Sequence, residues 1–128
     1  LSCRIGKEVL DIIDEENLSR NAKIIGKQLV NCLELLKTKY DVVGDVRGRG
    51  LFLGIELVED KISKMPATAL TSFVVQRMRS KRVLLGTEGP YANVLKIRPP
   101  LTIDKSAIDF LVLQLDETLK EAVELGVL

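Results

Sequence analysis

The glycine-punctuated segment Gly44-Asp-Val-Arg-Gly-Arg-Gly-Leu-Phe-Leu-Gly-Ile-Glu-Leu-Val58 constrains the fold more than any other stretch of this chain. Gly48 and Gly50 can take positive φ angles or let another part of the chain approach closely, and the guanidinium groups of Arg47 and Arg49 lie next to them. The segment therefore predicts a tight, cationic corner in the backbone.

An alternating strand follows this corner. Phe52, Gly54 and Glu56 share one face, and Gly54 leaves room there for another group to lie against the strand. The opposite face is apolar and is expected to be buried: Leu51, Leu53, Ile55 and Leu57. The glycines also match part of a nucleotide-binding pattern, but a dinucleotide fingerprint ends a strand and opens a helix. Here the glycines open a strand, so a hairpin turn is the favoured interpretation.

The composition indicates one globular domain with a genuine core. The chain has 128 residues, 46% of them hydrophobic, and 19 basic against 18 acidic residues give a net charge of +1. This balance gives no overall attraction to nucleic acid or to an anionic membrane, and no apolar run approaches the roughly 20 residues that span a bilayer. The chain contains no histidine, which excludes Ser-His and Cys-His catalysis within it.

The cysteines and the first residues bear on where the protein works. Cys3 and Cys32 lie in helical patterns without the spacing of a disulfide scaffold or a zinc site, which predicts reduced thiols. The chain begins at Leu1 without a signal-like segment. We therefore expect an intracellular fragment of a longer protein, cytoplasmic or mitochondrial.

The helical periodicities predict four helices. A short one ends at the acidic residues 14–16, and a long one over 18–37 is capped by Asn17. A third begins with Pro66 in its first turn and closes on a basic cluster, residues 77–82, which is typical of a solvated helix end. Asp104 caps the last helix.

Strands are expected at 42–43, from Leu51 onward, at 83–85 and at 93–98, with a turn over 86–90. Pro99 and Pro100 end the last strand because neither residue can donate to a ladder. The order of elements predicts an α+β fold in which helices pack on one face of a small, mainly antiparallel sheet. Residues 1–38 form N-terminal helices in this interpretation, and residues 39–128 form the α+β domain.

Lys96 and Arg98 form the candidate binding pair. Alternation along 93–98 places both side chains on one face of the strand, opposite Leu95 and Ile97. The two cations either converge on a multiply charged oxyanion such as phosphate or point into water from an exposed sheet face. Arg47 carries the same ambiguity, since it can equally pair with an acidic residue of a missing domain.

The chain also resembles a known family. Residues 44–58 and 93–101, with the spacing between them, are similar to the C-terminal small domain of class III pyridoxal-phosphate-dependent aminotransferases. Residues 3–22 are similar to the long helix that follows the active-site region in that family. Three short segments resemble one branch of this family in particular: residues 66–69, 81–85 and 88–90. This branch includes alanine-glyoxylate aminotransferase 2 and phospho-lyases acting on ethanolamine phosphate and phosphohydroxylysine.

The resemblance implies a fold-type I pyridoxal-phosphate enzyme, a transaminase or a phospho-lyase, whose cofactor lysine and most phosphate-binding groups belong to a large domain that precedes Leu1. It implies no catalytic residue and no metal here, inactivity of the isolated fragment, and as partners that large domain, a second subunit and an amine substrate. Lys96 replaces an arginine that grips a substrate carboxylate in typical members, which favours a phosphorylated amine. Arg98 is a second substrate-facing candidate. The interface or structural positions are Arg47, Gly48, Gly50 and Gly54. The alternative is a non-catalytic α+β interaction domain.

Overall fold

The computed structural model describes residues 1–127 and has an α+β architecture. The helices are α1 (Ser2–Glu15), α2 (Leu18–Lys39), α3 (Thr68–Ser80) and α4 (Lys105–Glu124). The strands are β1 (Val43–Arg49), β2 (Phe52–Leu57), β3 (Gly86–Glu88) and β4 (Val94–Ile97). No helix within residues 1–127 is long and apolar enough to cross a membrane.

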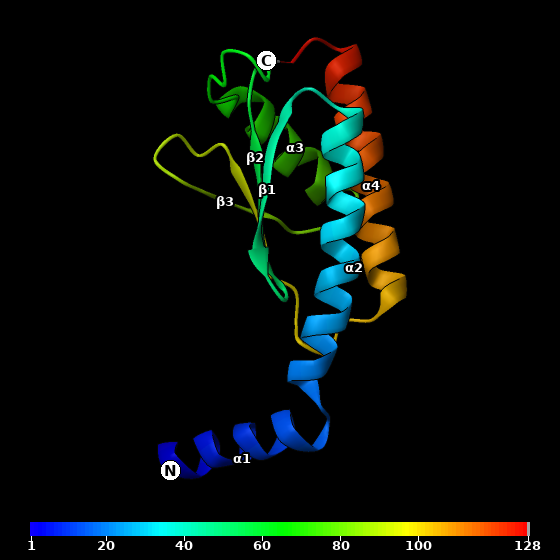
Figure 1. The fold of residues 1–128 in the computed structure, drawn as a ribbon. Helices are drawn as coiled ribbons and strands as arrows, with labels where there is room; N and C mark the ends of the chain where they lie inside the picture. Colours follow the sequence, from blue (N-terminus) through cyan, green and yellow to red (C-terminus); the bar gives the residue numbers. More distant parts are fainter. Residues whose placement is uncertain (128) are drawn as a thin grey trace.

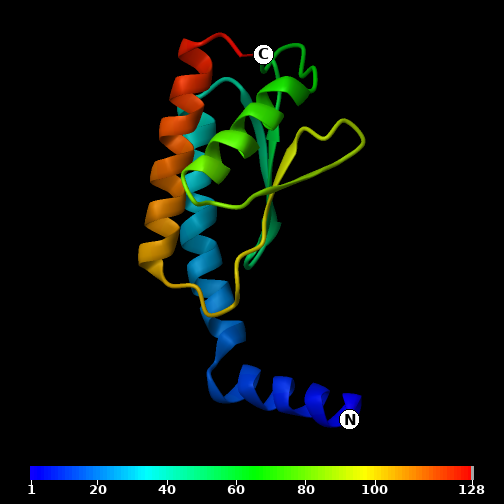
Figure 2. The same cartoon turned by 180° about the vertical axis from the view of Figure 1, so that it is seen from behind.

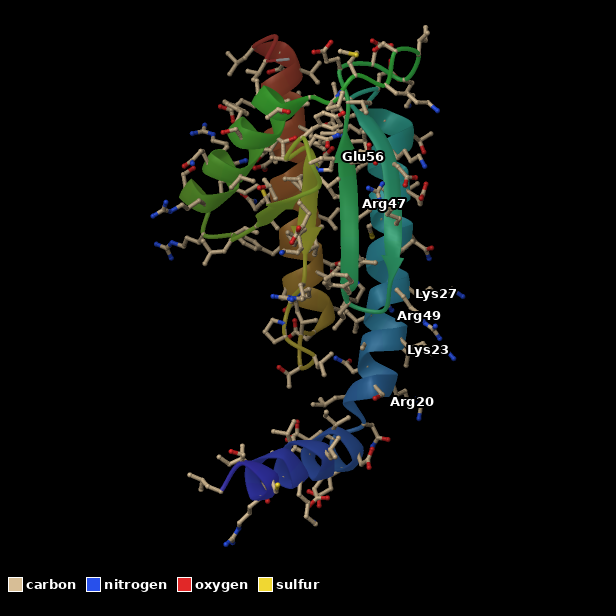
Figure 3. All side chains as sticks on the ribbon, turned by 90° about the vertical axis from the view of Figure 1, so that its left-hand side faces the viewer. Arg20, Lys23, Lys27, Arg47, Arg49 and Glu56 are labelled. Carbon is tan, nitrogen blue, oxygen red and sulfur yellow. The ribbon has the colours of Figure 1, made fainter. Side chains whose placement is uncertain are left out.

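The four strands form one sheet in the order β1-β2-β4-β3, and every neighbouring pair is antiparallel. Helices α2 and α3 contact the strands, and α4 packs against both of these helices. Figures 1 and 2 show these three helices on one side of the sheet, and Figure 3 looks onto the other, uncovered side. The predicted fold class, with helices on one face of a small antiparallel sheet, is confirmed.

The core lies between the sheet and the helices. The alternating residues of β2 and β4 enter it as predicted, with Leu53, Ile55 and Leu95 almost completely buried. Leu29 and Leu33 of α2 and Leu115 and Leu119 of α4 are fully buried against them. The polar side chains on the other face of the sheet do not enter this core. They remain available for contact with a ligand or with another part of the protein.

Helix α1 stands apart from this core. It extends away from the body of the molecule in Figures 1 and 2, and none of its residues is buried. The helix is amphipathic, and its apolar residues Ile5, Val9 and Leu10 are at least half exposed. Asn17, expected to cap α2 with its side chain, instead adopts a left-handed conformation with φ of 53° and makes no capping hydrogen bond. Asparagine tolerates this conformation better than most residues, so Asn17 makes the bend between α1 and α2.

The strand boundaries differ from the prediction in two places. Residues 44–49 continue β1, with a register shift between Val43 and Asp45, so the corner is shorter than expected. The predicted hairpin turn at the glycines is present and is confined to Gly50 and Leu51. Residues 83–85 do not form a strand, and Leu84 is 83% exposed. The strand lies at Gly86–Glu88 instead, where a turn was expected, because these residues reach the free edge of β4.

The helix starts give one correction and one confirmation. Helix α3 begins at Thr68 rather than at Pro66, because Pro66 pairs with Val58 in an isolated β-bridge. Asp104 caps α4 as predicted, with its side-chain Oδ1 accepting a hydrogen bond of 2.9 Å from the backbone N–H of Ala107. The backbone and side-chain hydrogen bonds hold the pKa of Asp104 below its ordinary value.

Candidate functional site

The uncovered sheet face carries a row of four residues, one from each strand. Arg47 pairs with Gly54, Gly54 pairs with Lys96, and Lys96 pairs with Gly86. Neighbouring strands lie about 4.8 Å apart, so Arg47 and Lys96 start roughly 10 Å from each other across Gly54. Lys96 therefore has a residue without a side chain on either side of it, and space opens around its ammonium group.

This space is a pocket of about 360 Å³. Arg47 and Lys96 line it together with Phe52, which is 59% exposed, and Glu88. Gly54 lies at its floor, where an added Cβ would approach the Val94 side chain to 3.1 Å. A volume of this size is at the lower end of the range of small-molecule sites. The pocket combines two cations, one aromatic ring and one carboxylate.

Glu88 is the immediate partner of Lys96. The Lys96 ammonium donates to the Glu88 carboxylate across the β3–β4 ladder, and the Lys96 side chain is 28% exposed. The hydrogen bond from Lys96, helped by its charge and that of Arg98, lowers the pKa of Glu88. Lys96 is therefore the cation of a mutual pair, and an incoming anion has to compete with Glu88 for it.

Arg47 is held by two carboxylates on the same face. Its Nη1 lies 2.5 Å from Glu56 Oε2 and 3.1 Å from Asp45 Oδ2. Figure 3 shows Arg47 and Glu56 side by side on β1 and β2. The hydrogen bonds that Arg47 donates to Glu56, and then to Asp45, raise the pKa of Arg47. Burial opposes ionisation of Asp45, but hydrogen bonds from Arg47 and Lys37 outweigh it, so the pKa of Asp45 is lowered.

The structure gives different positions to the two cations that alternation had grouped, although the charge of Arg98 still acts on Glu88. Lys96 lies in the pocket, whereas Arg98 follows the end of β4, is exposed and does not line the pocket. Gly48 and Gly50 have positive φ angles of 140° and 57°, and Gly50 lies in the turn between β1 and β2. Arg47, Gly48 and Gly54 all line the pocket.

Two residues of this site were missed by sequence reasoning, Gly86 and Glu88. Both were placed in a turn because the preceding run, residues 83–85, is more apolar. Their role depends on the pairing of β3 with β4, which places Gly86 opposite Lys96 and Glu88 opposite Val94, and the pattern within one segment does not encode which residues pair. No cluster of histidine, cysteine, aspartate and glutamate in residues 1–127 is arranged to hold a metal ion.

Residues 1–119 match the class-III aminotransferase family. The chain belongs to this family. It is 43% identical over 121 residues to the mitochondrial alanine–glyoxylate aminotransferase 2 homolog 2 of Arabidopsis thaliana, covering 94% of this chain and 25% of that protein. It is 35% identical over 120 residues to ethanolamine-phosphate phospho-lyase homolog 1 of Caenorhabditis elegans, covering 93% of this chain and 26% of that protein.

The fold agrees with solved structures of the family. A phospholyase from Arthrobacter in complex with phosphoethanolamine superposes with a TM-score of 0.86 and 42% identity, covering 90% of this chain and 27% of that one. The chain thus spans about a quarter of the length of the relatives it matches.

Proposed function

We propose that this class-III chain works as part of a pyridoxal-phosphate-dependent enzyme, and that the uncovered sheet face forms one wall of its substrate pocket. The observation that carries the proposal is Lys96 between Gly54 and Gly86, in a pocket whose other cation is Arg47. The reaction is amino transfer or elimination of phosphate from a phosphorylated amine.

The side chains around the pocket favour a phosphorylated amine. Lysine is a compact point charge on a flexible stem. It lacks the guanidinium fork that pairs bidentately with a carboxylate, but it is a common phosphate ligand in proteins. A phosphoryl group carries about −1.5 to −2 charges and three acceptor oxygens, so it can displace the single carboxylate of Glu88 from Lys96. Arg98, beyond the end of β4, is a second candidate for contact with the substrate.

The residues present do not make a cofactor site by themselves. No lysine among residues 1–127 is buried, so this part of the chain offers no desolvated amine of the kind that binds pyridoxal phosphate covalently. Lys96, the lysine in the pocket, is engaged by Glu88. We therefore assign cofactor binding to the large domain. The resemblance to the family also leads us to expect a dimer in which a second subunit completes the site, and an intracellular enzyme, cytoplasmic or mitochondrial.

The test uses the full-length enzyme loaded with pyridoxal phosphate and supplied with phosphoethanolamine. Release of inorganic phosphate is followed in one assay, and formation of alanine from added pyruvate in another. Either product, formed only with the cofactor, supports the proposal and distinguishes elimination from amino transfer. If neither product forms with phosphoethanolamine, nor alanine with a panel of unphosphorylated amines, the proposal is wrong and the non-catalytic interaction domain becomes the better account.

A further inference from the structure

Four basic side chains lie outside the Lys96 pocket, on the other side of Gly48, which lines both hollows. Arg20, Lys23 and Lys27 follow the i, i+3, i+7 spacing that places them on one face of α2, and Arg49 ends β1. Figure 3 shows all four side chains pointing to the same side of the molecule. All four residues are exposed. This face is therefore strongly positive although the chain as a whole is nearly neutral.

Two glycines bring the two elements together. A methyl group at Gly26 would overlap the carbonyl group of Gly50, so the β1–β2 turn lies directly on the backbone of α2. This contact places Arg49 beside Lys23 and Lys27. The three cations line a groove of about 490 Å³, which we call the basic groove. The remaining residues of the basic groove are small or apolar: Ser19, Ala22, Gly26, Val30, Gly48 and Gly50.

The charges of this face are not neutralised within the described chain. Across residues 1–127, Arg20, Lys23, Lys27 and Arg49 take part in no ion pair, and the basic groove is lined by no acidic residue. Arg47, two residues before Arg49 on the same strand, is paired with two carboxylates. The same strand therefore pairs one arginine with acidic side chains and leaves the next one without an ion pair within residues 1–127.

We infer that the basic groove binds a di- or triphosphate group. Such a group concentrates several negative charges within the length of two helical turns, whereas the carboxylates of an acidic peptide are spread over separate side chains. Lysines and an arginine are the side chains that most often bind phosphate. No aromatic residue lines the basic groove, so it lacks the stacking surface that single-stranded nucleic acid uses.

The test is a titration of the 128-residue chain with inorganic tripolyphosphate. Binding is monitored by calorimetry and by the backbone amide NMR signals of Gly26 and Gly50. The double variant Lys27→Gln/Arg49→Gln is expected to raise the dissociation constant about tenfold, because each exposed charge contributes up to about fivefold in binding. Arg79→Gln is the matched control, since Arg79 is also exposed and lies outside the basic groove, on α3. The control should stay within about twofold of the unmodified chain.

Two further arms identify the ligand. ATP should bind with an affinity like that of tripolyphosphate if the basic groove recognises the phosphate chain alone. It should bind more tightly if the ligand is a nucleotide whose nucleoside part also contacts the protein. Both results support the inference. A hexaglutamate peptide should bind more weakly than tripolyphosphate. The inference is overturned if tripolyphosphate shows no saturable binding up to about 10 mM, if the double variant binds as the unmodified chain does, or if hexaglutamate binds as well. Signals of Gly54 and Gly86 separate this binding from binding at Lys96.

Discussion

Lys96 has its place in the pocket because of its neighbours in the sheet rather than because of its own strand. Gly54 and Gly86 flank it on β2 and β3, and Glu88 takes up its charge. The ion pair is partly exposed, with 54% of the Glu88 side chain accessible, so its contribution to stability is small. The ion pair has a larger effect on anion binding, because Glu88 already binds the Lys96 ammonium group that an incoming anion would contact.

Replacing Glu88 tests this competition. Glu88→Gln keeps a hydrogen-bond acceptor near Lys96 but removes the negative charge, so inorganic phosphate should bind the pocket about two- to fivefold more tightly. The measurement is a phosphate titration of the 128-residue chain, read at the amide signals of Gly54 and Gly86. Glu124→Gln, which alters an exposed pair with Lys120 at the end of α4, is the control and should have no effect there. Unchanged or weaker binding in Glu88→Gln would show that Glu88 does not compete.

A second residue-scale prediction concerns Asp116 of α4. It accepts hydrogen bonds from Lys39 Nζ at 2.6 Å and from the buried Tyr40 hydroxyl at 2.7 Å. Burial tends to raise the pKa of Asp116, but the hydrogen bonds from Lys39 and Tyr40 outweigh it and the pKa is lowered. A carboxyl whose pKa is lower in the folded state stabilises the fold above its unfolded pKa, and the stabilisation is lost as the pH falls through the folded value.

Asp116→Asn should therefore lower the free energy of unfolding by about 0.5–1.5 kcal/mol at neutral pH, and the difference should shrink as the pH falls below about 4. Urea denaturation across this pH range measures it. Asp109→Asn, in an exposed pair with Lys105 on the same helix, should cost less than about 0.5 kcal/mol. A difference for Asp116→Asn that stays constant into acid would contradict the assigned role of the carboxylate.

At the scale of elements, the contact between Gly26 of α2 and Gly50 of the β1–β2 turn fixes how the hairpin lies on the helix. Gly26→Ala should lower the free energy of unfolding by about 1–3 kcal/mol, because the cost of overlap exceeds the gain of up to about 1 kcal/mol in helix propensity. Chemical denaturation measures the change. Gly6→Ala in α1 is the control: nothing lies within 4 Å of the added methyl group, and α1 buries no residue, so global stability should not fall. Equal effects of both substitutions would contradict this account.

The elements also show what local patterns can and cannot predict. The long helices, the Asp104 cap and the inward alternation of β2 were predictable, because each depends on spacing within one segment. The position of β3 was not predictable. The apolar run 83–85 indicated a strand, but the residues that pair with the edge of β4 are Gly86–Glu88. The site followed the same rule: Lys96 and Gly54 were found from alternation, whereas Glu88 and Gly86 depended on pairing between strands.

At the scale of the whole molecule, all helices that contact the core lie on one side of the sheet. The uncovered side carries Arg47, Lys96, Glu88 and the exposed Phe52. The chain spans about a quarter of the length of its relatives. We propose that the polar pocket on this sheet face and the exposed amphipathic helix α1 are the surfaces that meet the rest of a longer enzyme.

The measurement that tests the central claim most directly is the kinetics of Lys96→Ala in the full-length enzyme loaded with pyridoxal phosphate. Loss of one charge-assisted hydrogen bond, worth about 1.5–3 kcal/mol, predicts that kcat/KM for a phosphorylated amine falls about 10- to 150-fold, while cofactor content stays the same. Lys105→Ala, an exposed lysine of α4 outside the pocket, should leave both quantities unchanged. An unchanged kcat/KM in Lys96→Ala, or a loss of cofactor in parallel with activity, would contradict the assignment of the uncovered sheet face as a wall of the substrate pocket.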